Sequence, residues 1–435
     1  MQEKTNPNRK SIPLAHKAEE LILQNPEHEI LTNGLNLYLI ESGLEDVTRI
    51  DIIIGAGSVY QSKKLCASFT NQLLKEGTKT LNSVQIAEKL DFHGAYLSTS
   101  INKDKSTITL FSLTKHLSKL LPMLKSIVTE AIFPDYDFGI HLNRSRQEYL
   151  VNSEKARFLA NREFNTLIFG NETAYGQSAQ LNDFDQLTMD DLKEFYKVQY
   201  QPKNSYIIIS GKPDEESKQL IINLFGKEWH NNELDIIKPS NITSRQFKGD
   251  KTIKKEEFLQ SAIRMGKNAI SKFDIDFNKL IFTNTILGGY FGSRLMSNLR
   301  EDKGMTYGIY SMISNFAHGS YFAISTEVNI KQTAAALEEI KKEIDILQNE
   351  KTNEDEIELV KNYIYGSFLK NFDGAFSLAE MFRSAHDFGL DFDYYNESLK
   401  KIMSITSEEV MLTAQKYFNI DDMATLVVGD INQKK

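Results

Sequence analysis

The sequence contains a single cysteine, Cys66, among its 435 residues. One cysteine excludes an internal disulfide framework and any metal cluster that depends on several thiolates. Cys66 lies at helical spacing from Leu65 and Phe69, so we expect it to be a small buried side chain rather than a reactive thiol. We therefore do not expect the function of this protein to depend on cysteine chemistry.

The chain has neither an excess of basic charge nor long hydrophobic runs. Its formal net charge is −8, with acidic and basic residues interspersed, which leaves no basic stripe for a nucleic acid. The longest apolar runs, such as 52–54 and 206–209, are far shorter than the roughly 20 residues of a membrane-spanning helix. Residues 1–14 hold no apolar segment of a signal peptide. We therefore expect a soluble cytoplasmic protein with no nucleic-acid partner and no membrane span, or a periplasmic protein if a signal peptide has been removed.

Several motifs of common enzymes are also missing. The sequence has no Gly-x-x-x-x-Gly-Lys-Ser/Thr phosphate loop and no Gly-x-Ser-x-Gly nucleophile elbow. Its eight histidines are dispersed, and no two lie within two helical turns of each other. This spacing excludes the pair of histidines that zinc peptidases carry on one helix. His28-Glu29 begins such a motif, but Thr32 stands where the second histidine should be.

What the sequence does have is an internal repeat. Thr188 precedes an acidic, amphipathic helical segment and a run of β-formers that ends at Gly211, 23 residues later. Thr406 opens a similar segment that ends at Gly429, also 23 residues later. Each threonine is followed three residues on by an acid, as in a helix capping box. The identical spacing at the ends of two halves favours a duplicated domain over a coincidence of two common helix-to-strand units.

Shorter patterns predict the elements of each half. Asn33-Gly34 between alternating apolar residues predicts a β-hairpin. A helix is expected over 63–76, closed by Gly77, and a long helical pattern occupies most of 136–167. We therefore predict an α+β protein with two homologous halves, each a largely antiparallel sheet covered mainly on one face by helices.

The expected domains are residues 1–230, a linker over 231–250 and a second domain over 251–435. The linker has no clear hydrophobic period.

Segment 288–308, GGYFGSRLMSNLREDKGMTYG, is the richest in chemistry-bearing residues. It predicts a helix end, a short helix that Ser293 caps and Gly304 ends, and then a strand. Arg300 should lie near the end of the short helix and Tyr307 at the start of the strand.

Two interpretations of this pair remain open. A guanidinium and a phenol at such a junction are hydrogen-bond donors suited to peptide carbonyls or a developing oxyanion. Alternatively, Arg300 pairs with Glu301 or Asp302, or meets the helix dipole, while Tyr307 is a core residue.

GGYFGSRLMSNLRE followed by GMTYG resembles the second-domain signature of the insulinase and pitrilysin family of zinc peptidases, most closely the mitochondrial processing peptidase-like branch. The resemblance extends to GAGSVYQ at 55–61, to the segment from Leu73 to Ile108 and to the two repeated halves. It implies that Arg300 and Tyr307 contact substrate beside a zinc centre.

Active members of that family carry His-x-x-Glu-His on the helix before the Gly-Thr that stands here at 77–78. This sequence has Ser68 and Gln72 at the two histidine positions and Asn71 at the glutamate position. Hydroxyl and amide groups are poor zinc ligands and cannot accept a proton from bound water. Glu148 stands near the position of the third ligand, but one carboxylate does not form a zinc site. We therefore expect no catalytic residue and no metal in this chain.

The resemblance implies the non-catalytic, substrate-binding subunit of a heterodimeric zinc metalloendopeptidase. Its partner would be a relative that bears the zinc motif, its substrate a peptide or unfolded polypeptide, and zinc the partner's cofactor. In the alternative, the chain is a non-enzymatic scaffold or assembly protein, like the core subunits of the respiratory bc complex.

Overall fold

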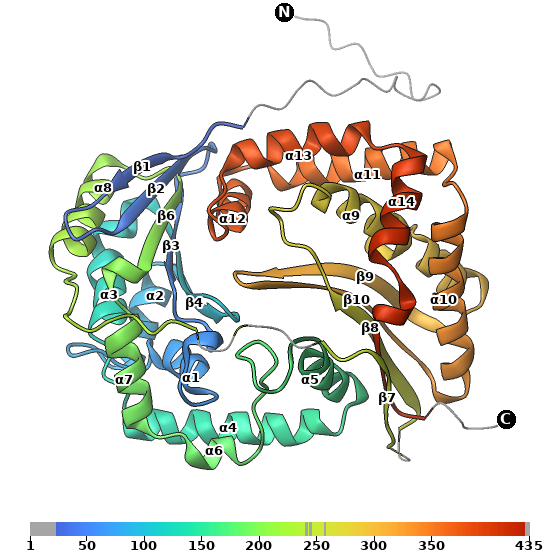
Figure 1. The fold of residues 1–435 in the computed structure, drawn as a ribbon. Coiled ribbons are helices and arrows are strands. Elements are labelled where there is room, and N and C mark those ends of the chain that lie inside the picture. Colours follow the sequence, from blue (N-terminus) through green and yellow to red (C-terminus); the bar gives the residue numbers. More distant parts are fainter. Residues whose placement is uncertain (1–22, 240–241, 243–245, 256–257, 431–435) are drawn as a thin grey trace, which may run out of the picture.

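The computed structural model describes residues 23–239, 242, 246–255 and 258–430. Within them the chain forms two α+β halves, each built on its own sheet (Figure 1). The residues on which the export expectation rests, 1–14, and parts of the expected linker, 240–241 and 243–245, lie outside the described residues.

The first sheet has the strand order β1-β2-β6-β3-β5-β4. Strands β2 and β6 run parallel, whereas the other neighbours run antiparallel. The hairpin at Asn33-Gly34 is confirmed, and Gly34 has the positive φ of 85° that its turn requires. The strands are β1 (Glu27–Ile30), β2 (Asn36–Glu41), β3 (Val47–Ile54), β4 (Tyr96–Ile101), β5 (Ser106–Leu113) and β6 (Ser205–Gly211).

The second sheet has the order β7-β11-β8-β10-β9, with β7 and β11 parallel and the other pairs antiparallel. This order and these directions match β2-β6-β3-β5-β4 of the first sheet. The predicted fold class of two homologous, largely antiparallel α+β halves is therefore confirmed. The strands are β7 (Gly249–Ile253), β8 (Gln260–Asn268), β9 (Thr306–Phe316), β10 (Gly319–Asn329) and β11 (Ala424–Val428).

Each half ends in the helix and strand that the repeat predicts. Thr188 accepts a hydrogen bond from the backbone of Asp191, and Thr406 accepts one from the backbone of Glu409. In both cases the acidic side chain bonds back to the threonine backbone, so both capping boxes are complete.

Helices of each half cover one face of its own sheet. In the first half, Ile50 and Ile52 of β3 pack with Phe69, Leu121 and Phe195 from three helices. The first-half helices are α1 (Cys66–Leu73), α2 (Ser83–Phe92), α3 (Leu117–Thr129), α4 (Asp135–Ser153), α5 (Ala156–Phe169), α6 (Asp183–Gln186), α7 (Met189–Gln199) and α8 (Glu215–Ile221). The second-half helices are α9 (Phe277–Asn284), α10 (Thr333–Asn349), α11 (Glu354–Asn371), α12 (Ala375–His386), α13 (Phe392–Ser404) and α14 (Ser407–Tyr417).

The halves exchange one helix each. Helix α5 belongs to the first half in sequence, but its Phe164 packs with Ala262 and Leu426 of the second sheet. Helix α12 of the second half places Phe382 against Tyr38 of the first sheet. Figure 1 shows α5 beside the second sheet and α12 beside the first. The other face of each sheet is thus covered by a helix from the other half.

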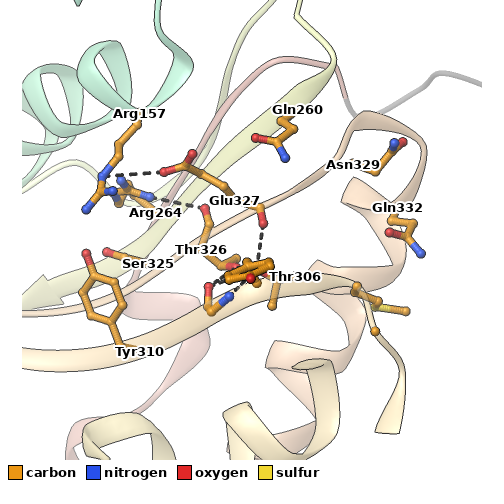
Figure 2. Close-up of a pocket in the computed structure, with 14 residues that line it drawn as sticks. Arg157, Gln260, Arg264, Thr306, Tyr310, Ser325, Thr326, Glu327, Asn329 and Gln332 are labelled. Atoms are coloured by element: carbon orange, nitrogen blue, oxygen red, sulfur yellow. Dashed lines mark hydrogen bonds and ion pairs between the residues drawn. The ribbon is translucent and has the colours of Figure 1, made fainter. Parts of the chain in front are cut away.

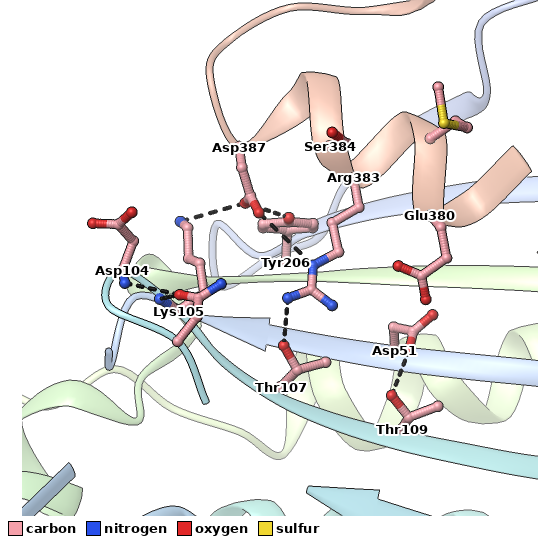
Figure 3. A network of polar contacts seen from close by, with 12 residues as sticks. Asp51, Asp104, Lys105, Thr107, Thr109, Tyr206, Glu380, Arg383, Ser384 and Asp387 are labelled. Atoms are coloured by element: carbon pink, nitrogen blue, oxygen red, sulfur yellow. Dashed lines mark hydrogen bonds and ion pairs between the residues drawn. The ribbon is translucent and has the colours of Figure 1, made fainter. Parts of the chain in front are cut away.

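Polar contacts hold α12 against the first sheet (Figure 3). Arg383 donates from Nη2 to Thr107 Oγ1 at 2.8 Å, and the Tyr206 hydroxyl donates to Asp387 Oδ1 at 2.6 Å. Arg49 of β3 forms an ion pair with Glu380. The bond to Asp387 satisfies the hydroxyl of Tyr206, a residue that is 6% exposed between the halves.

Two expected helices differ in the structure. The helix predicted over 63–76 is α1, Cys66–Leu73, and starts late because Leu65 has a left-handed φ of 72°. The long helix predicted over most of 136–167 is two helices, separated by Glu154 and by Lys155, whose backbone is extended. This break turns the chain so that α5 reaches the second sheet.

None of the helices in the described ranges combines the length and hydrophobicity needed to cross a membrane.

Candidate functional site

Helix α1 carries Ser68, Asn71 and Gln72, the three positions of the altered zinc motif. Ser68 is half-buried and donates from Oγ to the Leu65 carbonyl oxygen at 2.8 Å. Gln72 is exposed to solvent. The two positions that would carry imidazoles therefore lie in different surroundings.

Asn71 is part of the core. It is 1% exposed, and its Nδ2 donates to Ser106 Oγ of β5. Ser106 Oγ lies in turn 2.9 Å from the Tyr200 hydroxyl. Burial raises the pKa of Tyr200 to about 12, although the hydrogen bonds from Ser106 and Asn71 act in the opposite direction. Asn71 thus belongs to a neutral buried hydrogen-bond chain and is not available as a base.

The surroundings of Ser68 do not fit a zinc ion. Ser68 lines a pocket of about 350 Å³ together with Lys64, Lys103, Arg162 and Glu172. Three cations against one carboxylate oppose the binding of a doubly charged metal ion. The cations come from separate segments, so the sequence spacing alone did not reveal them.

Glu148, near the expected third-ligand position, lies outside this pocket. It pairs with Arg144 at 2.9 Å, and its side chain is 58% exposed. In the part of the chain that the structure describes, no group of three or more His, Cys, Asp or Glu side chains has the arrangement of a metal site. The residues present therefore do not fit the zinc site of active relatives.

Cys66 is fully buried, as expected. Its Sγ donates to the carbonyl oxygen of Asp191 at 3.3 Å, and burial raises its pKa to about 12. The thiol is therefore neutral near pH 7 and not a nucleophile.

Gly288, at the start of segment 288–308, serves close packing. A Cβ on Gly288 would lie 2.6 Å from Ser311 Oγ and 2.7 Å from its backbone nitrogen. Gly288 belongs to the π-helix η5 (Thr285–Gly289), which continues α9 and packs on β9. Only a residue without a side chain permits this approach.

Arg294 of the same segment fastens it to α11. Its guanidinium forms two hydrogen bonds with Glu356, Nε to Oε1 at 2.9 Å and Nη2 to Oε2 at 2.8 Å. Sequence reasoning missed this role, because Glu356 lies 62 residues away. The expected cap at Ser293 is wrong, because its Oγ is buried and has no hydrogen-bond partner among the described residues.

Arg300 lies on the π-helix η6 (Met296–Asp302), close to its end as predicted. Its guanidinium carbon is 4.6 Å from the ring centroid of Phe291, a cation–π contact. It forms no ion pair with Glu301, Asp302 or any other residue that the structure describes, so the pairing alternative is wrong. The helix gives way to β9 at Gly304, whose φ of 58° is left-handed.

Tyr307 lies on a β-bulge. Between Thr306 and Ile309, β9 has two residues, Tyr307 and Gly308, opposite the single residue Glu327 of β10. A bulge of this kind locally redirects side chains and is frequent beside functional sites. The Tyr307 side chain is 96% exposed and makes no hydrogen bond with the described residues. The alternative that Tyr307 is a core residue is therefore wrong.

Two threonines compensate for the hydrogen bonds that the bulge interrupts. Thr306 Oγ1 donates to the Glu327 carbonyl oxygen at 2.7 Å and accepts from the Gly308 backbone nitrogen at 3.1 Å. Thr326 Oγ1 lies 3.0 Å from the Gly308 carbonyl oxygen and 2.9 Å from Thr306 Oγ1. These hydroxyls satisfy backbone hydrogen-bonding groups of the bulge, so a hydrogen bond from the Tyr307 side chain is not needed to stabilise it.

A pocket of about 580 Å³ opens beside the bulge (Figure 2). Tyr307 lines it, and Arg300 is not among its lining residues. The structure thus places the two predicted contact residues on neighbouring elements without a hydrogen bond between them. It adds Arg157 and Arg264, which sequence reasoning missed. The available signal was the arginine within the apolar strand SAIRMG, because unpaired charges are rare at buried positions.

The fold and these two sites define a two-halved protein of zinc-peptidase architecture whose metal-ligand positions hold other residues. Residues 38–175 match the family described as insulinase (peptidase family M16), and residues 186–364 match the peptidase M16 inactive domain. The chain belongs to this family, and the predicted resemblance is confirmed.

Known relatives match over most of the chain. An uncharacterized zinc protease of Rickettsia bellii is 23% identical over 417 residues, covering 92% of this chain and 97% of the relative. The non-peptidase homolog YmxG of Helicobacter pylori is 22% identical over 398 residues, covering 88% of each chain. The crystal structure of a peptidase M16 inactive domain from Pseudomonas fluorescens aligns with a TM-score of 0.86 and 20% identity, covering 95% of this chain and 99% of that chain. The likeness to this structure concerns the fold alone.

Proposed function

We propose that this chain is the non-catalytic, substrate-binding subunit of a heterodimeric zinc metalloendopeptidase. The observation that carries the proposal is the exposure of Tyr307, 96%, on a bulge that other residues stabilise. A large aromatic side chain that contributes neither packing nor a hydrogen bond to the fold is available for contact with another molecule.

The altered zinc positions support a non-catalytic role. Asn71 is bound within the core and Ser68 faces a cationic pocket. A relative named as a non-peptidase homolog, and another from Bacillus subtilis named as a probable inactive metalloprotease, agree with this role.

In this proposal, Arg300 and Tyr307 donate hydrogen bonds to a peptide held at the partner's zinc. Two such donors orient the peptide backbone and stabilise the oxyanion of the tetrahedral intermediate. Arg300 is held over Phe291 and by no carboxylate within the described ranges, so its N–H donors are available for such a contact.

The remaining expectations belong to the same proposal. The partner is a relative that bears the zinc motif, zinc is the partner's cofactor, and this chain binds none. The substrate is a peptide or unfolded polypeptide, and the compartment is the cytoplasm. Residues 1–230 and 251–435 act as two domains joined by 231–250.

The experiment is reconstitution of the chain with a zinc-motif relative from the same genome, using a quenched fluorogenic peptide mixture. We expect Tyr307→Phe to lower kcat by about 100-fold, the effect of removing one oxyanion donor, and Arg300→Ala to lower it at least as much. Assembly of the pair and the melting temperature should not change, because Tyr307 makes no fold-stabilising hydrogen bond with the described residues.

The matched control is Tyr136→Phe, which removes the hydroxyl of another exposed tyrosine, 78% exposed on α4. It should leave turnover unchanged. Unchanged turnover in both the Arg300 and Tyr307 variants would contradict the proposed roles. If the chain gives no stimulation of an active relative, the scaffold alternative gains support instead.

A further inference from the structure

Three polar side chains form a row across the second sheet. Arg264 of β8 pairs with Ser325 of β10, and Ser325 pairs with Tyr310 of β9. Residues directly opposite each other in antiparallel strands project from the same face of the sheet. All three line the 580 Å³ pocket that Tyr307 also lines (Figure 2).

Arg264 is the most buried member of the row, with 3% of its surface exposed. Its Nε donates to Asn161 Oδ1 at 2.9 Å, and its Nη1 donates to the backbone oxygens of Ile263 at 2.8 Å and Thr326 at 3.3 Å. All three acceptors are neutral. Its Nη2 donates to no residue within the described part of the chain. A buried charge without a carboxylate partner is costly, so this site is incomplete by itself.

Helix α5 brings a second arginine to the same place. Arg157 and Asn161 lie four residues apart, on one side of this exchanged helix. Arg157 lies 3.6 Å from Glu327 and is 63% exposed. Burial lowers the pKa of Arg264, and the charge of Arg157 lowers it further, although Glu327 acts in the opposite direction. Two arginines and one glutamate leave the pocket with a net positive charge.

Ser325 supplies a further unused donor. It is 2% exposed, and its Oγ has no hydrogen-bond partner among the residues that the structure describes. Ser325 pairs with Arg264 on one side and with Tyr310 on the other, so its side chain lies between theirs on the same face of the sheet.

We infer that Arg264, Ser325 and Arg157 form a binding site for a carboxylate group of a peptide. A guanidinium presents parallel N–H donors that match the two oxygens of a carboxylate. One carboxylate carries one negative charge, which balances the net charge of the pocket, whereas a phosphate would exceed it. The carboxylate is an acidic side chain or the C-terminus of the peptide.

This inference rests on the proposed function, because Tyr307 and the row line one pocket and the carboxylate belongs to the peptide that Tyr307 contacts. It adds a substrate class: peptides with an acid or a chain end close to the segment at Tyr307. The two arginines come from different halves, so the helix exchange is what assembles the site.

The test measures fluorescence polarisation of three labelled decapeptides with the isolated full-length chain. One peptide has blocked ends and no acid, the second has blocked ends and one central glutamate, and the third has no acid and a free C-terminus. We expect one carboxylate peptide, or both, to bind at least tenfold more tightly than the neutral peptide. Which of the two does so identifies the source of the carboxylate.

Arg264→Gln and Arg157→Gln should each remove this preference, and Ser325→Ala should reduce it. Arg157 is largely exposed, so its variant tests the site even if Arg264→Gln fails to fold. Arg144→Gln is the matched control, because Arg144 is 75% exposed and also pairs with one glutamate, on α4 outside the pocket. It should retain the preference.

The outcomes separate this inference from the proposed function. Binding of all three peptides with equal affinity, or a preference that survives in the Arg157 and Arg264 variants, overturns the carboxylate site but leaves the peptide-binding role. If no peptide binds, saturation-transfer NMR with N-acetylglycine and its amide gives the second readout. Contact by the acid alone, lost in the Arg157 variant, then supports the carboxylate site, and contact by neither or equally by both overturns it; the peptide-binding role is decided separately by the reconstituted pair.

Discussion

The two halves share one topology but differ in what their equivalent regions expose. In the first half, Asn71 on α1 is buried in a hydrogen-bond chain with Ser106, and the pocket beside Ser68 is cationic. In the second half, the segment at 288–308 exposes Tyr307 on a bulge and leaves Arg300 without an acidic partner among the described residues.

This difference shows that the equivalent regions of the two halves are used differently: Asn71 of the first half bonds within the fold, whereas Tyr307 of the second half faces solvent. In the first half, Asn71 at the glutamate position is bound within the core, whereas Ser68 and Gln72 at the two histidine positions remain half-buried and exposed, respectively. The second half presents two polar donors, Tyr307 and Arg300, that the fold does not use among the described residues and that are accessible to another molecule. The halves are nevertheless not independent, because α5 and α12 cross between them.

The largest effect should come from the exchanged helices. Phe164 of α5 and Phe382 of α12 are each 3% exposed. Replacing either with alanine should lower the free energy of unfolding by about 3–5 kcal/mol, because it leaves a cavity in a packed interface. Calorimetry should show the whole chain melting at a lower temperature in one transition.

The control is Phe92→Ala, which should have little effect because Phe92 is 85% exposed. Two separate transitions, of which only one moves, would show that the halves fold independently.

Restoring the zinc motif should have the next largest effect. In the variant Ser68→His, Asn71→Glu, Gln72→His, a carboxylate replaces the buried amide of Asn71. An uncompensated buried charge costs about 3 kcal/mol, so we expect a lower melting temperature and no stoichiometric zinc by elemental analysis.

The single variant Gln72→His is the control, because Gln72 is exposed. It should melt like the wild type. If the triple variant instead binds one zinc per chain and cleaves peptides, the first half differs from that of active relatives only in the motif residues and not in their surroundings.

The smallest effect compares the two copies directly. Thr188→Ala and Thr406→Ala each remove one side of a complete capping box and should each cost about 1 kcal/mol. The two costs should add in the double variant, because the boxes lie in different halves. Serine at either position keeps the hydroxyl and should restore most of the stability. Unequal costs would show that the copies have diverged, and Lys63, which pairs with Asp191 at 2.8 Å, is the first residue to test.

Local patterns predicted much of the fold. Asn33-Gly34 specifies its turn, and Thr188 and Thr406 specify their caps, because these residues act on neighbours within a few positions. The altered motif at Ser68, Asn71 and Gln72 could likewise be identified from the sequence. The late start of α1 and the break after α4 could not be predicted, because they depend on backbone angles at Leu65 and Lys155 that packing imposes.

The sequence predicted only part of the candidate site. Arg300 and Tyr307 were placed correctly at a helix end and a strand start, since both belong to one segment. Arg157 and Arg264 were not found, because 107 residues of sequence separate them and their pocket exists only where α5 meets the second sheet.

By itself, the sequence determined the duplicated α+β architecture, the family and the loss of the zinc ligands. These are properties of short segments and of their repetition, and they do not require knowledge of distant contacts. The tertiary structure alone decided that Tyr307 is exposed, that Asn71 is buried and that two arginines from different halves share a pocket. The physical reason is that burial and charge balance depend on side chains that folding brings together from distant parts of the chain.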